Sequence, residues 1–386
     1  MSGAGTAVLG AAAPVPASSR ALRVTVPLAS FNLSGGVKVL VAIANAMAAR
    51  GWPVEVLVPE FASDSPFPLH PGVRVRVLGT GGARLPRSLR ALVHYGRLGW
   101  HAARGADVVL ANYFPTAFCA VLSRALRHRR AVVVYYAQGY EAESHGLIAE
   151  ANRVSRWARF AAARLSYRLP VRLFCVSAWV ARRIGRADSV VAHAPALDLE
   201  VFQPRPRPAR PRVTLGVIGR SGVNKGYQVF LDAVARLRER EDLEIVVVSP
   251  RAGEVPPPTG VTVSMVEARS EAIMAGFYER CDIFVLPSYV EGFPLPPLEA
   301  MASGCAVVTT ACGGVADYAV DGVNALVVPP GDSDALAAAV QRVCVDGELR
   351  RRLAQTGIET ARRFARDRMA AEFLEAVEGT WSRCRR

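Results

Sequence analysis

The stretch Leu286–Pro330, LPSYVEGFPLPPLEAMASGCAVVTTACGGVADYAVDGVNALVVPP, has an order of apolar runs and loops that predicts one βαβ unit. It begins at the end of an apolar run, 283–286, that is typical of a buried strand. A short helix is expected to start near Pro296, because the amide that proline lacks would have no helical partner in a first turn. Gly304 ends that helix, and 305–308 forms the next strand. The loop and the helix start therefore lie at the carboxyl edge of a parallel sheet, where open α/β sheets bind ligands.

Two carboxylates belong to this unit. Glu291 lies in the loop, and Glu299, eight positions later, lies in the expected first helical turn. Free amides at a helix N-terminus bind anions, and the helix dipole stabilises the bound charge. The two acids could hold two parts of an elongated polar ligand while the amides hold an anion between them. The alternative is structural, with Glu299 capping the helix and Glu291 solvated in the loop.

A basic, glycine-rich turn follows the expected strand 213–218. It contains Gly219 and Arg220, and Lys225 stands just before the next expected helix, 227–240. Arginine can bind two phosphate oxygens as a fork, lysine adds a point charge, and glycine lets a phosphate approach the backbone amides. The turn thus predicts a diphosphate site, and the alternative is a solvated basic loop. The chain has only one other lysine, Lys38, so its positive charge is almost entirely arginine.

The first half alternates short apolar runs with helical patterns, which predicts a doubly wound α/β domain. A glycine turn, Gly35-Gly36, separates the first expected strand from helix 37–50, so the backbone there could approach a phosphate or a sugar. An ordinary tight turn is the alternative. The expected strands of this half are 22–28, 54–58, 108–110, 131–136 and 173–176.

Length and composition indicate a globular protein of two to three domains. The chain has 386 residues, is 51% hydrophobic and carries a formal net charge of +14. Its seven cysteines form no CxxC pair and are typical of reduced core residues in a cytosolic protein. Residues 1–20 lack a basic start and predict a disordered tail rather than a signal peptide. No apolar run approaches 18 residues, which predicts no membrane span.

Two regions combine arginines with aromatic residues. Region 84–104 includes Tyr95 and Trp100, and Arg153–Arg172 includes Trp157. At helical spacing the second region places arginines beside an apolar face, which is compatible with an interfacial helix on anionic lipid. An ordinary amphipathic helix is the alternative. No nucleic-acid module motif is present, so we expect no nucleic-acid partner.

The motifs together resemble those of the GT-B glycosyltransferases, specifically the retaining family 4 group. Residues 291–293 followed by 297–302 are similar to its E-x7-E signature. Residues 313–315, 321–325 and 329–332 continue the pattern of that family. The resemblance implies an α/β GT-B fold in which two Rossmann-like, doubly wound domains face each other across a cleft.

The resemblance also implies a division of the chain. The expected parts are a disordered tail at 1–20, an N-terminal acceptor-side domain at 21–194, a proline- and arginine-rich linker at 195–212, a C-terminal nucleotide-sugar-binding domain at 213–363, and a helix crossing back to the first domain at 364–386.

The resemblance implies roles for residues of the second half. Arg220 and Lys225 would bind the donor diphosphate. Glu299 would take the ribose hydroxyls, and Glu291 would act as a catalytic residue at a hydroxyl of the transferred sugar. The remaining donor-binding residues expected there are Gly219, Gly292, Phe293 and Leu295.

In the first half, Gly35 and Gly36 match the family's glycine loop over the donor pyrophosphate. The run Gln138-Gly139-Tyr140-Glu141 follows a strand where many members place a histidine close to the transferred sugar. We expect Gln138 in that catalytic position, and a loop-end residue that bonds its own backbone is the alternative. The family implies no metal or other cofactor, and the D-x-D pattern at Asp332 favours helix capping over metal binding.

The resemblance implies a retaining hexosyltransferase-type enzyme of class EC 2.4. It would move a sugar from a nucleoside-diphosphate sugar to a glycan or a lipid-linked acceptor in cell-surface polysaccharide biosynthesis. The expected location is cytoplasmic, with peripheral binding at the inner face of the membrane. The alternatives are a non-catalytic sugar-nucleotide or lipid-surface binding subunit, and a GT-B sugar-nucleotide epimerase or phosphorylase.

Overall fold

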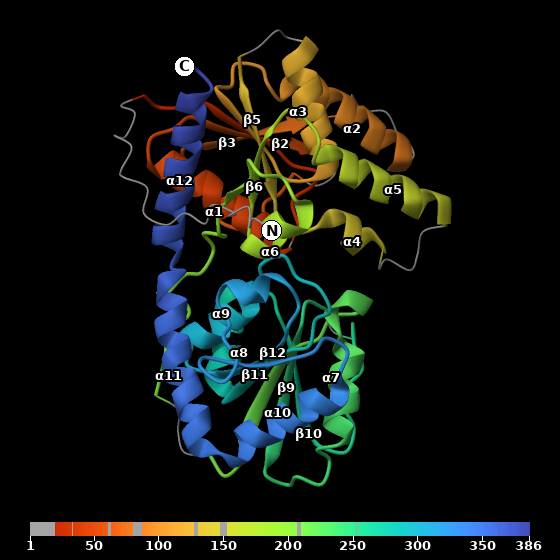
Figure 1. Cartoon of the computed structure of the whole chain (residues 1–386), viewed down its shortest axis with the longest axis vertical. Helices are drawn as coiled ribbons and strands as arrows, with labels where there is room; N and C mark the ends of the chain where they lie inside the picture. Colours follow the sequence, from red (N-terminus) through yellow and green to blue (C-terminus); the bar gives the residue numbers. More distant parts are fainter. Residues whose placement is uncertain are drawn as a thin grey trace, which may run out of the picture. The chain divides into compact units, whose positions relative to one another are not determined.

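The structure is a computed structural model, and it describes residues 20–32, 34–60, 63–79, 87–126, 130–146, 153–206, 210–251 and 253–386. Nearly all of the expected tail at 1–20, part of the first arginine-rich region and the middle of the expected linker fall outside these ranges. The described chain forms two compact units (Figure 1). The first extends to Ala196 and includes Asp367–Arg386, and the second is Leu197–Arg366.

The first unit is built on a parallel sheet. Within the described ranges its seven strands have the order β3-β2-β1-β4-β5-β6-β7. Its central strands are buried along their whole length, which is why their sequences are continuous apolar runs rather than alternating patterns. The strands are β1 (Val24–Pro27), β2 (Val54–Pro59), β3 (Val73–Leu78), β4 (Val108–Ala111), β5 (Val132–Ala137), β6 (Arg172–Cys175) and β7 (Val190–Val191).

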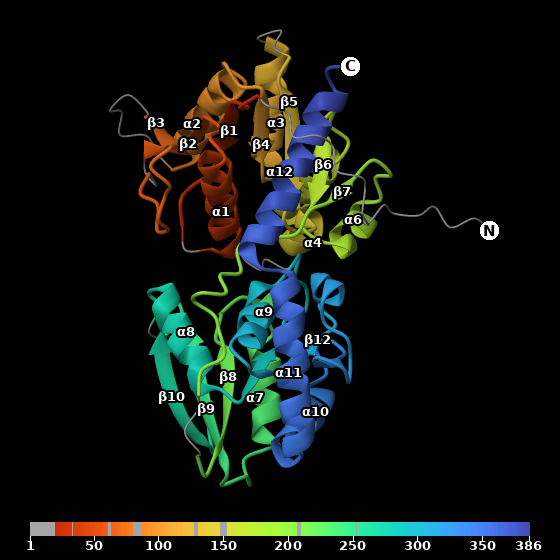
Figure 2. The ribbon, with the colours of Figure 1, turned by 90° about the vertical axis from the view of Figure 1, so that its left-hand side faces the viewer.

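Helices cover both faces of this sheet. In Figure 2, α1 and α12 lie on the face toward the viewer, and α2 and α3 lie on the opposite face. The helices are α1 (Gly35–Ala49), α2 (Arg87–His101), α3 (Phe114–Leu126), α4 (Glu141–Gly146), α5 (Arg153–Ser166), α6 (Ala178–Ile184) and the C-terminal α12 (Arg366–Arg383).

Helix α12 is held to the sheet by aromatic packing. Phe373 is 1% exposed, and its ring lies edge-on to Tyr136 of β5 at 5.2 Å and to Phe174 of β6 at 5.7 Å, measured between ring centroids. Arg50, at the end of α1, pairs with Glu378 of α12 at 3.2 Å. The last helix of the chain is therefore part of the core of the first unit.

The second unit repeats the same architecture. Within the described ranges its sheet has the all-parallel order β10-β9-β8-β11-β12-β13. The strands are β8 (Val213–Ile218), β9 (Leu243–Ser249), β10 (Thr262–Glu267), β11 (Ile283–Leu286), β12 (Ala306–Thr310) and β13 (Leu326–Val328). The helices are α7 (Tyr227–Ala235), α8 (Glu271–Arg280), α9 (Leu295–Ala302), α10 (Ser333–Val345) and α11 (Gly347–Arg363). Two parallel, doubly wound sheets confirm the predicted pair of Rossmann-like domains.

The packing of α12 generates a stability prediction. We expect Phe373→Ala to lower the free energy of unfolding by about 3–5 kcal/mol, because it removes a buried ring and leaves a cavity between α12, β5 and β6. Urea denaturation measures the loss. Leu126→Ala, at a residue that is 54% exposed on α3, is the control and should change stability by less than about 0.5 kcal/mol. Equal losses in both variants would contradict the packing role.

Candidate functional site

Two loops of the second unit contact each other at the carboxyl edge of its sheet. One follows β8 and the other follows β11, and these two strands are parallel neighbours. Gly226 has φ +67°, and a Cβ at this position would lie 1.9 Å from the carbonyl oxygen of Pro287. The amide of Tyr289 donates to the carbonyl of Asn224 at 2.8 Å. Only glycine fits at 226, and this close approach brings Lys225 to the β11 loop.

Lys225 forms an ion pair with Glu291, the carboxylate of that loop. Its Nζ lies 2.9 Å from Glu291 Oε1, and Ser288 Oγ donates to the same oxygen at 2.9 Å. The backbone of Glu291 is also fixed, because its amide donates to the Cys312 carbonyl at 2.6 Å and its carbonyl accepts from the Gly314 amide at 2.9 Å. The structure thus joins two residues predicted separately from two motifs. Burial, with the nearby Glu291 charge, raises the pKa of the Cys312 thiol to about 12, so this cysteine stays neutral.

The loop after Glu291 depends on a second close approach. A Cβ at Gly314 would lie 1.8 Å from the carbonyl oxygen of Gly292, so position 314 also requires glycine. Phe293 is 8% exposed and packs against Tyr318 and Phe364, with ring centroids 5.5 and 5.7 Å away. The side chain of Phe293 therefore anchors the loop in the core, and only its backbone could serve a ligand.

Glu299 differs from its prediction. Helix α9 begins at Leu295, so Glu299 is the fifth helical residue, and the first turn contains no acidic residue. The expectation of a first-turn carboxylate is wrong, and so is the capping alternative, because the N-cap is Pro294 and makes no side-chain hydrogen bond. The prolines after Leu295 lie inside the first turn, where their missing amides cost nothing. Glu299 is 6% exposed and accepts a hydrogen bond from the Tyr278 hydroxyl at 3.1 Å.

The remaining predicted residues of this unit have different surroundings. Arg220 directly follows β8, is half-buried, and makes no hydrogen bond or ion pair with any residue in the described ranges. Gly219 is buried, and a Cβ there would lie 2.5 Å from Val255. Glycine at 219 is therefore required for packing, whereas Arg220 keeps its guanidinium available.

The first unit has a cavity of about 300 Å³ at the carboxyl ends of β1, β4 and β5. The structure brings Gly36 and Gln138 together there, since a Cβ at Gly36 would lie 3.0 Å from Gln138 Oε1. Ser34 begins α1 beside them, and its hydroxyl accepts from the Val37 amide at 3.4 Å. Gly35 is exposed and does not line the cavity.

Glu141 also lines this cavity, although only its neighbour Gln138 was selected from the sequence. Its Oε1 accepts from the Tyr135 hydroxyl at 2.8 Å, and its Oε2 accepts from the Phe114 amide at 3.1 Å. Burial raises the pKa of Glu141 to about 7, even though both hydrogen bonds favour the charged form. Burial and the Glu141 charge together raise the pKa of Tyr113, another cavity residue, to about 12. The sequence signal that could have identified Glu141 was an acidic residue just after a buried strand.

Two further predictions concern surface residues. Asp332 accepts from the Ala335 amide at 2.8 Å at the start of α10, which confirms the capping interpretation of the D-x-D pattern, and Asp334 pairs with Arg236. On α5, Trp157 is 72% exposed, and the Arg164 guanidinium lies 5.9 Å from the centroid of the Phe160 ring. None of the helices in the described ranges has the length and apolar composition needed to cross a membrane.

Comparison with known families matches both halves of the chain. Residues 34–196 match the model of the glycosyl transferase 4-like domain. Residues 212–346 match the model of the glycosyl transferases group 1.

Among curated relatives, the chain is 31% identical over 214 residues to the D-inositol 3-phosphate glycosyltransferase of Stackebrandtia nassauensis, which covers 49% of this chain and 48% of that protein. It is 30% identical over 174 residues to the MMP alpha-(1->4)-mannosyltransferase of Mycolicibacterium hassiacum, covering 42% and 41%. The chain thus spans about half the length, or less, of these two relatives. A lower identity of 27% extends over 384 residues of the D-inositol 3-phosphate glycosyltransferase of Arthrobacter sp., covering 89% and 90%.

Solved structures share the fold over nearly the whole chain. The sucrose-phosphate synthase of Thermosynechococcus elongatus has a TM-score of 0.77 at 19% identity, covering 94% of this chain and 99% of that one. The Anabaena protein HepE, solved in complex with UDP-glucose, has a TM-score of 0.69 at 17% identity, covering 93% and 100%. At these identities the likeness establishes the fold.

The surroundings of Glu141 generate a prediction on pH. Because its pKa is raised from 4.5 to about 7 in the folded chain, the folded state binds this proton more tightly than the unfolded state. Its contribution to stability is therefore fully present below about pH 4.5 and is lost as the pH rises through about 7. We expect Glu141→Gln, which stays neutral, to gain stability relative to wild type across this window.

Urea denaturation of both proteins at a series of pH values tests this. Glu375→Gln, on the exposed side of α12, is the control for loss of one negative charge. A difference between wild type and Glu141→Gln that stays constant from about pH 4 to 8 would contradict the assignment.

Proposed function

We propose that this chain, which belongs to the group 1 family of GT-B glycosyltransferases, is a retaining enzyme that moves a sugar from a nucleoside-diphosphate sugar to a glycan or lipid-linked acceptor. One observation carries the proposal. The ammonium of Lys225 and the carboxylate of Glu291 meet at 2.9 Å at the carboxyl edge of the second sheet, with the uncommitted Arg220 directly after β8. Cations and a carboxylate at one sheet edge suit a ligand that has a diphosphate at one end and hydroxyls at the other.

The roles proposed for Lys225, Arg220 and Glu291 follow from the hydrogen-bond donors and acceptors that their contacts leave unused. Lys225 uses one of its three N–H donors on Glu291, and Arg220 keeps its fork, so both can bind diphosphate oxygens. No described residue donates to Glu291 Oε2, which leaves that oxygen to accept a sugar hydroxyl. Fixed positive charge near the departing diphosphate would lower the barrier to transfer by electrostatic stabilisation. No metal is needed for this scheme.

Other assignments extend the same proposal. Glu299 is proposed for the ribose hydroxyls, which requires the ligand to reach a carboxylate that is 6% exposed beside Tyr278. The amides at the start of α9 and the glycine turns are proposed to contact donor oxygens. The residues concerned are Gly35, Gly36, Gly219, Gly292, Phe293 and Leu295.

The cavity of the first unit is proposed to hold the transferred sugar or part of the acceptor. Gln138 and Glu141 supply an amide and a carboxyl whose pKa is raised to about 7. Such a carboxyl changes protonation near neutral pH, so it can accept or donate a hydrogen bond to a hydroxyl. We keep Gln138 as the proposed catalytic residue and add Glu141, which lines the same cavity.

The names of the relatives support the proposed class of donor. HepE was solved with UDP-glucose, and the curated relatives are named for transfer to inositol phosphate or for mannose transfer. These names fit a nucleoside-diphosphate hexose as donor. The glycan or lipid-linked acceptor, in cell-surface polysaccharide biosynthesis, is proposed from the resemblance of the motifs to the family. We place the enzyme in the cytoplasm at the inner face of the membrane, because α5 presents Trp157 beside arginines.

The donor site can be tested with Lys225→Ala. Loss of this charge should lower sugar transfer by about 100-fold or more and abolish the rise in melting temperature caused by UDP, GDP, ADP or dTDP. Lys225→Arg keeps the charge and should retain part of the transfer activity and part of the nucleotide-induced rise in melting temperature. Near wild-type turnover in Lys225→Ala, with an unchanged nucleotide shift, would rule out the diphosphate assignment.

Product analysis separates this proposal from its alternatives. A transferase consumes the acceptor and keeps the anomeric configuration of the sugar, which NMR of the product reports. An epimerase converts the donor without any acceptor. A non-catalytic subunit binds the nucleotide with neither reaction.

Membrane binding by α5 can be tested with vesicles. We expect Trp157→Ala to reduce co-sedimentation with vesicles that contain phosphatidylglycerol, because its exposed ring would enter the lipid interface. Val345→Ala removes another exposed apolar side chain, 64% exposed on α10, and should have no effect. Equal binding by both variants would exclude this role for α5.

A further inference from the structure

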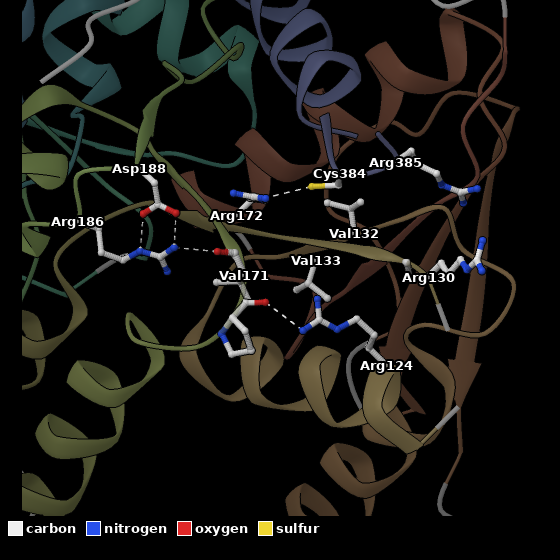
Figure 3. A pocket seen from close by; sticks show the side chains of 12 residues that line it. Arg124, Arg130, Val132, Val133, Val171, Arg172, Arg186, Asp188, Cys384 and Arg385 are labelled. Atoms are coloured by element: carbon white, nitrogen blue, oxygen red, sulfur yellow. Dashed lines mark hydrogen bonds and ion pairs between the residues drawn. The ribbon is translucent and has the colours of Figure 1, made fainter. Parts of the chain in front are cut away.

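The first unit contains a second, larger cavity, of about 650 Å³, whose lining includes five arginines (Figure 3). It is formed by the N-terminal ends of β5 and β6, the end of α3, the connection from α6 to β7, and the residues after α12. Its charged side chains are Arg124, Arg130, Arg172, Arg186, Arg385 and Asp188. Five cations and one carboxylate give this cavity a strongly positive lining.

This cavity is separate from the one at Gln138. Strand β5 runs from Val132, which lines the arginine cavity, to Ala137, directly before Gln138. Six residues of strand span about 20 Å, so the two cavities lie at opposite ends of one buried strand. A ligand at the arginine cavity would not be part of the proposed donor or acceptor site.

Arg186 stabilises the wall of the cavity through hydrogen bonds within the protein. Its guanidinium donates to both carboxylate oxygens of Asp188 at 2.9 and 2.7 Å, and to the carbonyls of Tyr167, Leu169 and Val171 at 2.9 to 3.2 Å. These five hydrogen bonds use all five N–H donors of the guanidinium, so Arg186 has none left for a ligand. The Arg186 hydrogen bonds hold the pKa of Asp188 below its usual value, so the single carboxylate stays ionised and paired. Asp188 is therefore committed to Arg186, and within the described ranges Arg124, Arg130 and Arg172 have no ion-pair partner.

Three other arginines keep most of their donors free. Arg124 donates through one nitrogen to the Pro170 carbonyl at 3.1 Å, and Arg172 donates through Nε to Cys384 Sγ at 3.3 Å. Arg130 makes no hydrogen bond or ion pair within the described ranges. In Figure 3, Arg172 turns toward Cys384 while Arg130 extends on the side of the cavity away from Arg186. Arg385 is held more firmly, 4.9 Å over the Trp381 ring and 3.6 Å from Asp107.

We propose that this cavity binds a phosphate-bearing group, either a diphosphate or a phosphomonoester. Guanidinium forks match phosphate oxygens in geometry and charge, and three that keep free donors line this one cavity. Like charges brought together in a cavity repel each other, and an anion with two or more charges removes that cost. The positive lining excludes a divalent cation. A free diphosphate and the headgroup of a lipid would both provide this chemistry.

Calorimetry with inorganic pyrophosphate tests the site. The proposed donor site would also bind this probe, so the titration is made in wild type, in Lys225→Ala and in Arg130→Ala/Arg172→Ala. We expect Lys225→Ala to retain one binding event, and the double arginine change to weaken that event by about tenfold or more. Arg74→Ala/Arg76→Ala, on β3 of the same unit, removes the same charge elsewhere and should leave it unchanged.

The rate of alkylation of Cys384 reports whether the cavity is occupied. It is the exposed cysteine among seven, and the other six are buried, so iodoacetamide should modify it first in the folded protein. Because its thiol lies 3.3 Å from Arg172 inside the cavity, bound pyrophosphate should slow this alkylation severalfold. The protection should persist in Lys225→Ala and disappear in Arg130→Ala/Arg172→Ala.

The outcomes separate the two sites. If Lys225→Ala abolishes all pyrophosphate binding, the arginine cavity is not a phosphate site and the donor proposal stands. If pyrophosphate binds Lys225→Ala without protecting Cys384, the arginine cavity is not a phosphate site. If the β3 variant loses binding as much as the cavity variant, the effect is general charge and the proposal fails. Loss only in the cavity variant, with protection of Cys384, supports it.

Vesicles distinguish the two sources of the phosphate. Phosphatidylcholine vesicles containing phosphatidic acid present a phosphomonoester, and they are tested with Trp157→Ala protein to remove the proposed contribution of α5. Vesicle binding that pyrophosphate displaces, and that Arg130→Ala/Arg172→Ala lacks, identifies a lipid headgroup. Pyrophosphate binding with no such vesicle binding identifies a free anion, and absence of both overturns the proposal.

Discussion

The close approach of the loop after β8 to the loop after β11 is the constraint on which the second unit's site depends. At Gly226 there is no room for a side chain, because a Cβ would lie 1.9 Å from the Pro287 carbonyl oxygen. This contact places Lys225 beside Glu291, and each charge is stabilised by the other in a partly buried setting. An anion at this site must share Lys225 with Glu291. In the proposed donor complex, the pair would hold the carboxylate in position and present the Lys225 ammonium to the diphosphate.

The parallel sheet explains why the first unit offers two kinds of cavity. At the carboxyl ends of its strands, the loops and the start of α1 form a small polar cavity around Gln138 and Glu141. At the opposite ends, strand starts and helix ends carry arginines instead. Buried strand β5 connects the two but keeps them apart, and its side chains offer a ligand no path between them. The ligands proposed for the two cavities would therefore not compete for the same site.

Most of the candidate site of the second unit was predictable because local sequence specifies it. The strand 213–218 was predicted with its observed bounds, and Asp332 was identified as a helix cap, since continuous apolar runs and a capping aspartate are strong local signals. Lys225 and Glu291 were also identified, each within a glycine-rich loop after a buried strand. The edge strand β3 was missed because strands of the first half were predicted only from continuous apolar runs, whereas its VRVRVL alternation is typical of a half-exposed strand. The environment of Glu299 was missed because a shift of the helix start changes which turn contains the carboxylate.

The sequence by itself determined the class of fold, the parallel sheets and the loops that carry the charged residues, because burial periodicity and glycine positions are local properties. Only the tertiary structure decided which of these residues meet. It placed Lys225 2.9 Å from Glu291, left Glu299 buried beside Tyr278, and gathered arginines from five separate segments around one cavity. Each of those arginines looks like an ordinary surface residue in the sequence. Their convergence depends on strand order and helix packing, and no local pattern records it.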